Sequence, residues 1–119
     1  MGRIHGDLPD RTFKFSLAIL EIVDRLPSDN KGWIVTRQLV RSGTAVGANI
    51  AEADHAHTAI EFARCCNIAL KESAEAEYWL RLCRESGLIG GDQLAPLLGE
   101  CDEIIRILTA VVKRTQSAH

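Results

Sequence analysis

The stretch VRSGTAVGANIAEADH, residues Val40 to His55, decides how the rest of the chain is interpreted. It contains two glycines, a serine, a threonine and an asparagine, yet its apolar residues recur at helical spacing. A phosphate-binding P-loop has the pattern GxxxxGK[ST], whereas Gly43 and Gly47 enclose three residues and Ala48 follows. The GxGxxG dinucleotide fingerprint is absent as well. The spacing therefore predicts a helix and argues against a nucleotide-binding loop.

Small residues in this helix share one side. Gly43, Gly47 and Ala51 recur at four-residue steps, which places them on a single stripe. Two interior glycines cost a helix about 2 kcal/mol relative to alanine, and a whole domain is stable by only about 5–15 kcal/mol. We therefore expect another backbone to pack closely against this stripe. The alternative is a locally weak helix that its neighbours hold in place.

Helical periodicity extends over most of the chain. Helices are expected at about residues 10–26, 31–53, 58–86 and 92–114. Asp10 and Asp92 are candidate N-caps, and Thr58 to Glu61 matches a capping box. Pro27 is expected to end the first helix, and Gly87 suits the left-handed position that follows the third. Short connections make neighbouring long helices antiparallel. Residues 1–119 are therefore predicted to form one all-α domain, an up-down-up-down antiparallel four-helix bundle.

Apolar spacing predicts which faces form the core. Aromatic residues make up only 5% of the chain, so Leu, Ile, Val and Ala must fill most of the core. In the first helix the expected face is Phe13, Leu17, Leu20 and Val23, widened by Phe15, Ile19, Ile22 and Leu26. In the third helix a heptad seam is expected at Phe62, Cys66, Ala69, Ser73, Ala76, Leu80 and Cys83. In the fourth helix the expected face is Leu94, Leu98, Cys101, Ile105, Leu108 and Val112.

Charge and hydropathy argue against a membrane or export. The net charge of −2 gives no overall attraction for nucleic acid or an anionic membrane. The longest uncharged run, Ser42 to Ala51, is half of the roughly 20 residues that a membrane-spanning helix needs. The N-terminus has no apolar signal core, so a cytoplasmic protein is expected. Its cysteines are then expected to be reduced thiols inside helices, namely Cys65, Cys66, Cys83 and Cys101.

Catalytic and metal chemistry find little support in the sequence. Cys65 and Cys66 are adjacent and lack the two-residue gap that lets two thiolates reach one zinc. His55 and His57 have no evident third ligand. Cysteine, histidine and acidic residues are present, but no local signature of a nucleophile joins them. We therefore expect no enzyme activity, no metal and no cofactor.

Charged residues of the second and third helices are expected to meet. A crude antiparallel register places Arg37 opposite Glu75, and Arg41 opposite Lys71 and Glu72. Neither arginine has an acidic residue three or four positions away on its own helix, so partners on the third helix or on another subunit are expected. Glu72 and Glu75 share a face but lack the Glu-x-x-His pattern of di-iron bundles, which favours ion pairing.

Two further polar residues lie near the apolar face of the second helix. Asn49 and Glu52 must be hydrogen-bonded if they are buried, and such groups often define register in helical assemblies. The alternative is that Glu52 and the arginines are solvated surface charges. The residues expected at helix-packing or oligomer contacts are Arg37, Arg41, Gly43, Gly47, Asn49, Glu52, Glu72 and Glu75.

Two runs together closely resemble one bacterial family of four-helix bundles. They are QLVRSGTAVGANIAE, residues 38–52, and FARCCNIALKESAEAEYWLRLCRESGLI, residues 62–89. The family is named after proteins encoded in intervening sequences of 23S rRNA genes, and the likeness covers about residues 13–112. By this resemblance, Arg41, Asn49, Glu52 and Glu75 match polar motif positions with an architectural role at helix or subunit contacts.

The resemblance also implies an assembly and partners. It implies a ring-like homopentamer with a central channel. It further implies kinship with the accessory variability determinant of diversity-generating retroelements, which assists a reverse transcriptase and binds nucleic acid. The family has no established enzymatic activity or cofactor. We therefore expect a non-catalytic homo-oligomeric scaffold whose main partner is itself.

The alternative is a nucleic-acid-binding accessory protein of a reverse transcriptase or of ribosomal RNA. Nucleic-acid-binding relatives are expected to be strongly basic, because phosphate neutralisation supplies most of that affinity. This chain is slightly acidic, but Arg106, Lys113 and Arg114 could form a basic rim around a ring, in contact with RNA or DNA. Such residues are equally typical of a solvated helix C-terminus, where the helix macrodipole favours cations.

Overall fold

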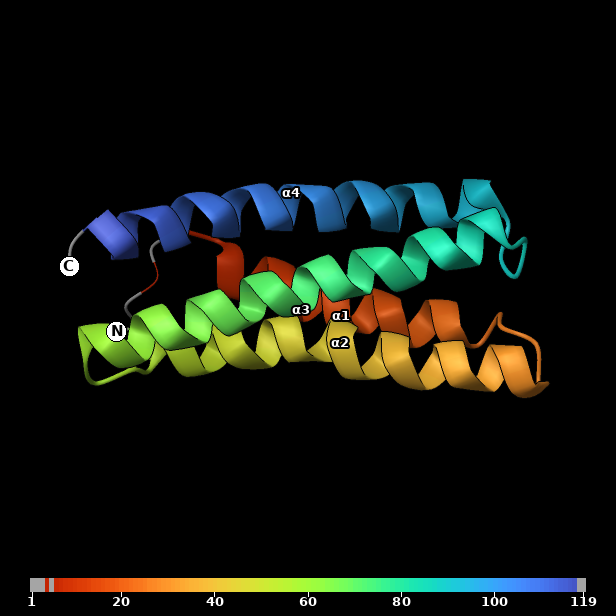
Figure 1. Cartoon of the computed structure of the whole chain (residues 1–119), viewed down its shortest axis with the longest axis horizontal. Coiled ribbons are helices and arrows are strands. Elements are labelled where there is room, and N and C mark those ends of the chain that lie inside the picture. The colour runs from red at the N-terminus through yellow and green to blue at the C-terminus, as the bar shows by residue number, and fades with distance from the viewer. Residues whose placement is uncertain (1–3, 5, 118–119) are drawn as a thin grey trace.

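Four α-helices make up the computed structural model, which describes residue 4 and residues 6–117. Their bounds are α1 (Leu8–Val23), α2 (Asn30–Asp54), α3 (Ala59–Glu85) and α4 (Gly91–Ser117). The helices lie side by side along the long axis, and successive helices are joined by short connections at alternate ends (Figure 1). No strand occurs among the described residues, which agrees with the predicted all-α class.

The helix ends differ from the predictions mainly in α1 and α4. Asp7, rather than Asp10, precedes α1, and Pro9 lies in the first turn, where no intrahelical N–H bond is lost. The helix stops at Val23, before the predicted residue 26. The predicted cap at Asp92 is wrong, because α4 already begins at Gly91. Asp92 instead lies in the first turn, where the helix macrodipole also favours a carboxylate.

Both predicted signals around α3 are present. The Thr58 hydroxyl accepts a hydrogen bond from the Glu61 N–H (3.1 Å), while the Glu61 carboxylate accepts one from the His57 N–H (3.3 Å). At the other end Gly87 has a φ of 74°. Leu88 N–H donates to the carbonyl of Cys83 (3.1 Å) and Gly87 N–H to that of Arg84 (3.2 Å). This is the Schellman pattern, which satisfies the last carbonyls of the helix.

The start of α2 depends on a glycine that the sequence interpretation overlooked. Asp29 caps the helix, because its carboxylate accepts a hydrogen bond from the Gly32 N–H (2.8 Å). A Cβ added at Gly32 would lie 1.8 Å from the backbone oxygen of Pro27. The turn from α1 into α2 therefore passes too close to the helix for any side chain at position 32.

The core follows the predicted seam of α3 but only part of the predicted face of α1. All seam positions of α3 are buried except Phe62, which is partly buried. On α1 the prediction is wrong for Phe13, Leu17 and Leu20, which are 63%, 48% and 47% exposed. It is confirmed for the residues expected to widen that face, because Phe15, Ile19, Ile22 and Leu26 are all buried. The buried residues of α1 are Leu8, Thr12, Phe15, Ile19 and Ile22. The Thr12 hydroxyl is accommodated there because it donates to the Leu8 carbonyl (2.9 Å).

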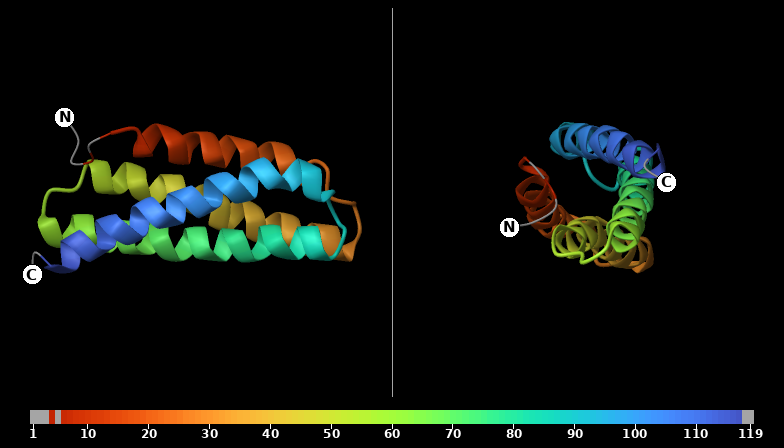
Figure 2. Two further views of the ribbon diagram at one scale, coloured as in Figure 1. Left: turned by 90° about the horizontal axis from the view of Figure 1, so that it is seen from above. Right: turned by 90° about the vertical axis from the view of Figure 1, so that its left-hand side faces the viewer.

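The face of α4 is rotated slightly from the prediction. Leu97 and Ile104 are buried, whereas Leu98 and Ile105 are only partly buried. The α1–α4 side of the bundle is the more open one, because α1 packs mainly on α2 and α4 mainly on α3 (Figure 2). A groove of about 390 Å³ lies there, and the Arg11–Glu100 ion pair (2.6 Å) bridges the two helices beside it.

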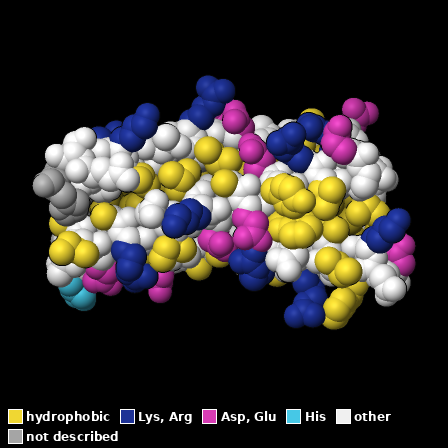
Figure 3. Space-filling model, in the orientation of Figure 1, with side chains coloured by type: hydrophobic (Ala, Val, Ile, Leu, Met, Phe, Trp, Pro, Cys, Tyr) yellow, Lys and Arg dark blue, Asp and Glu magenta, His cyan; other side chains and the backbone are white. Residues whose placement is uncertain are grey.

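Large apolar side chains are also exposed on the α2–α3 side. Ile34 on α2 is 53% exposed, and Tyr78 and Leu82 on α3 are 58% and 38% exposed. Figure 3 shows hydrophobic side chains gathered over the C-terminal half of α3. The Tyr78 ring meets the neighbouring Trp79 ring edge to face, with centroids 5.2 Å apart. This surface therefore lies on α2 and α3, whereas the exposed Phe13, Leu17 and Leu20 lie on α1.

The two glycines of α2 lie against α1 of the same chain. A Cβ added at Gly43 would lie 2.7 Å from Cγ1 of Ile19. One added at Gly47 would lie 3.0 Å from the backbone oxygen of Thr12. The close approach therefore involves both a side chain and the backbone of α1, while Ala51, the third member of the stripe, is exposed.

Replacing Gly47 by leucine should destabilise the fold by about 1–3 kcal/mol, because the new side chain must enter the contact with the α1 backbone. Urea and thermal unfolding measure the effect. Gly99 offers a matched control, since it is exposed in α4 and an added Cβ there meets nothing within 4 Å. Gly99→Leu should be neutral or stabilising, because leucine is the better helix former. Equal stability of Gly47→Leu and wild type would contradict the close-contact argument.

Candidate functional site

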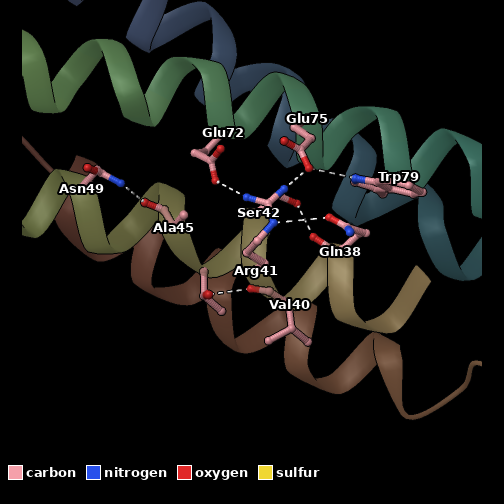
Figure 4. Close-up of polar contacts among 10 residues, drawn as sticks. Gln38, Val40, Arg41, Ser42, Ala45, Asn49, Glu72, Glu75 and Trp79 are labelled. Carbon is pink, nitrogen blue, oxygen red and sulfur yellow. Dashed lines mark hydrogen bonds and ion pairs between the residues drawn. The ribbon is translucent and has the colours of Figure 1, made fainter. Parts of the chain in front are cut away.

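A cluster of polar side chains joins α2 to α3 near the middle of the bundle. The guanidinium of Arg41 donates to the carboxylates of Glu72 (3.0 Å) and Glu75, and its Nε donates to the Gln38 side chain (3.3 Å). Figure 4 shows Arg41 reaching from α2 toward both acids on α3. Glu72 and Glu75 are three residues apart and so share one helix face. One guanidinium can therefore bridge them.

Glu75 is the most strongly engaged acid of this cluster. Trp79 donates its indole N–H to the Glu75 carboxylate (3.1 Å). This hydrogen bond and the one from Arg41 lower the pKa of Glu75 below its usual value. The hydrogen bond with Glu75 in turn raises the pKa of Arg41. Because the Glu75 side chain is 37% exposed, the cluster is a partly solvated ion pair and contributes modestly to stability.

The predicted register is right for one arginine and wrong for the other. Arg41 meets Glu72 as expected. Arg37 does not pair with Glu75, whose partners are Arg41 and Trp79. The guanidinium carbon of Arg37 instead lies 4.8 Å from the centroid of the exposed Trp33 ring. The crude register was thus shifted by about one helical turn at this position.

Among the described residues, the side chains of Asn49 and Glu52 form no hydrogen bond or ion pair with another helix. The Asn49 amide donates to the Ala45 carbonyl one turn earlier (2.8 Å), and Asn49 is partly buried. Glu52 is exposed near the end of α2. Neither residue defines the register of α2 against its neighbours within this chain.

Nucleophilic chemistry is disfavoured at the cysteines. All four are buried, free thiols. Burial raises the pKa of Cys66 and of Cys83 to about 11, and that of Cys101 to about 12. These three thiols are therefore protonated at neutral pH, and the thiolate is the nucleophilic form. In the described part of the chain, no group of three or more His, Cys, Asp and Glu side chains is arranged to hold a metal ion.

The cations of α4 gain a neighbour from α3. Arg106 is paired with Asp102 (3.1 Å), while Lys113 and Arg114 are exposed. A shallow groove of about 310 Å³ is lined by Arg64 of α3 together with residues of the last turns of α4. Arg64 was not singled out in the sequence, because only the packing of α3 on α4 brings it to this end of the bundle.

No helix among the described residues is long and apolar enough to cross a membrane.

Comparison with known proteins identifies the family. The family model described as 23S rRNA-intervening sequence protein matches residues 7–110. The chain belongs to this family. The match includes all of α2 and α3, and with them the whole Arg41 cluster. None of the curated proteins compared with this chain matches it.

A solved structure of a similar protein supports the fold. It is the crystal structure of a protein with unknown function from the S23 ribosomal protein family of Bacteroides thetaiotaomicron VPI-5482. The two chains are 34% identical, and the match covers 89% of this chain and 98% of the other with a TM-score of 0.83. Family membership therefore rests on both sequence and structure, while the function of the neighbour is itself unknown.

Replacing Glu75 by glutamine should lower the free energy of unfolding at neutral pH by about 0.2–1 kcal/mol, the range for partly exposed ion pairs. Because the pKa of folded Glu75 lies below its ordinary value of 4.5, this stabilisation is complete above pH 4.5 and is lost as the pH falls through the lower folded value. Wild type and variant should converge in acid. Urea unfolding across this pH range measures the difference.

Glu103→Gln is the control for this measurement, since Glu103 is exposed on α4. It should change the free energy of unfolding by less than about 0.5 kcal/mol. A deficit of Glu75→Gln that is equal at neutral and acid pH would show that the charge of Glu75 contributes nothing.

Proposed function

We propose that this protein is a non-catalytic subunit of a homo-oligomeric scaffold. The observation that carries the proposal is the outer side of α1, where Phe13, Leu17 and Leu20 are about half exposed or more. We call these three residues the α1 stripe. They are spaced four and three residues apart, as on a helix face that packs against another helix. The opposite side of α1 fills the core, whereas none of the described residues buries the α1 stripe.

Energetics favour burial of the α1 stripe. Single exposed leucines are ordinary on protein surfaces, but a contiguous apolar strip typically marks an interaction site. Full burial of one large apolar side chain is worth about 1.5–3 kcal/mol. The exposed portions of three such side chains would therefore contribute a few kcal/mol to association, before the entropic cost of binding.

The most specific form of the proposal is a ring of five antiparallel bundles in the cytoplasm, as the resemblance to the family implies. In such a ring the buried thiols and the Arg41 cluster are structural, and polar outer surfaces recruit a protein or nucleic-acid partner. Family membership supports the shared fold, and the α1 stripe supports self-association.

The test is the native mass of the purified chain by multi-angle light scattering. Wild type should form an assembly near five times the 13.1 kDa of one chain. Leu17→Glu should reduce it to smaller species, because the new carboxylate would be desolvated in the interface. Ala110→Glu is the control, as Ala110 is exposed on α4, and it should keep the wild-type mass. A monomeric wild type at micromolar concentration would refute the scaffold.

Nucleic-acid binding is the second candidate, as part of a reverse transcriptase or ribosomal RNA complex. The observation in its favour is the position of Arg64 beside the last turns of α4. Arg64 is exposed, as are Arg106, Lys113 and Arg114 of α4, so the two neighbouring helices carry these four exposed cations. Repetition of this group around a ring would produce a basic rim in spite of the acidic net charge.

Binding of RNA or DNA should then weaken steeply as salt rises, because bound phosphates release counterions. Changing Arg106, Lys113 and Arg114 to Glu should abolish it in a fluorescence-anisotropy titration. A charge-matched control changes Arg25, Lys31 and Arg84, which are all exposed, to Glu. The control should bind more tightly than the first variant. Equal loss in both would indicate a response to net charge alone, and no binding by wild type at low salt would exclude this candidate.

A further inference from the structure

Among the described residues, six of the eight large apolar side chains that are exposed form two groups on different sides of α2, and the other two are Trp33 and Ile60. The first is the α1 stripe. The second, which we call the α2–α3 patch, consists of Ile34, Tyr78 and Leu82. α2 packs against α1 on one side and α3 on the other, while α1 and α3 do not contact each other. The end-on view in Figure 2 shows the same order of helices around the bundle. The two groups therefore lie on different sides of α2 and differ in composition.

Helical spacing unites the α2–α3 patch. Arg41 bridges from α2 to Glu72 and Glu75 on α3, which defines the register of the two helices. Ile34 precedes Arg41 by seven residues and so lies on the same side of α2. Leu82 follows Glu75 by seven residues on α3, and because the chain reverses between α2 and α3 (Figure 1), both apolar residues lie at the same end of the Arg41 cluster.

Two unlike apolar surfaces on one chain suit one kind of assembly. A two-fold interface joins a surface to its own copy, whereas a closed ring with more than two members joins one surface to a different one. We propose that the α1 stripe of one copy docks on the α2–α3 patch of the next copy. This inference rests on the proposed homo-oligomer and goes further by assigning the two faces of its interface.

Charges beside the two surfaces are complementary. Asp24 continues the α1 stripe by helical spacing, four residues after Leu20, and Glu21 lies four residues after Leu17. Both acids are exposed, and among the described residues neither forms an ion pair, whereas Lys14 on the same helix is paired with Asp10 (3.0 Å). Glu21 and Asp24 are therefore unpaired acids beside the α1 stripe, and the exposed Arg25, which forms no ion pair among the described residues either, follows Asp24.

The unpaired charges beside the α2–α3 patch are basic. Arg37 lies three residues after Ile34, while Lys71 precedes Tyr78 by seven residues and Arg81 follows it by three. All three cations are exposed, and within the described part of the chain none of them has a carboxylate partner within ion-pair distance. Opposite charges around two apolar surfaces steer association and set the register of the interface. A second copy of this chain thus matches the patch in both apolar character and charge.

The decisive experiment mixes two variants that each lack one face. Leu17→Glu removes the α1 stripe but keeps the α2–α3 patch, and Tyr78→Glu does the reverse. Each variant alone should be monomeric. Their equimolar mixture should form a species of twice the 13.1 kDa monomer mass, because one complementary pair of faces remains. Analytical ultracentrifugation at about 100 μM suits the measurement, since a single contact lacks the avidity of a closed ring.

A matched control mixes Leu17→Glu with Phe13→Glu, which both damage the α1 stripe, and this mixture should stay monomeric. Circular dichroism and melting temperature verify that each variant is folded, as expected for exposed positions. The assignment of faces is overturned if the mixture of Leu17→Glu and Tyr78→Glu stays monomeric, or if Tyr78→Glu alone keeps the wild-type mass. In either case, assembly of the wild type would still support the proposed function. A monomeric wild type overturns both.

Discussion

The close contact between α2 and α1 is the constraint on which the rest of the structure depends. Gly47 lies against the backbone carbonyl of Thr12, and Gly43 lies against the side chain of Ile19. This contact determines how α1 is rotated, and therefore that Phe15 and Ile19 enter the core while Leu17 faces outward. The two glycines lower the helix propensity of α2 and so reduce its stability. Dispersion contacts between the closely packed helices offset this loss. A local sequence feature of one helix thus determines which surface its neighbour presents to solvent.

The other side of α2 packs against α3 through different interactions. Arg41 holds α3 through two carboxylates in a partly solvated ion pair, which is worth little energy but is geometrically specific, because a guanidinium donates in a planar fork. Below this cluster the packing is apolar, with the seam of α3 narrowed by small residues such as Ala69 and Ser73. α2 therefore has one side that permits close approach and one that defines register.

Two apolar surfaces remain after the core is filled, and they connect the fold to the proposed function. Transfer of exposed aromatic and aliphatic side chains out of water is favourable, so these two surfaces favour association. Family membership provides the fold without a function, since the solved neighbour from the S23 ribosomal protein family is itself of unknown function. Function must therefore be argued from the surfaces themselves.

Sequence alone determined the four helices, the caps at Thr58 and Gly87, and the heptad seam of α3, because these depend on local hydrogen bonding and on helical periodicity. It also indicated that Arg41 reaches Glu72. Only the tertiary structure decided which of the two apolar faces of α1 is buried, since both faces have similar spacing and composition. The tertiary structure also shows why position 32 must be glycine. A side chain there would clash with the backbone oxygen of Pro27, which lies on the other side of a turn. Periodicity describes one helix at a time, whereas burial depends on where the neighbouring helix is placed.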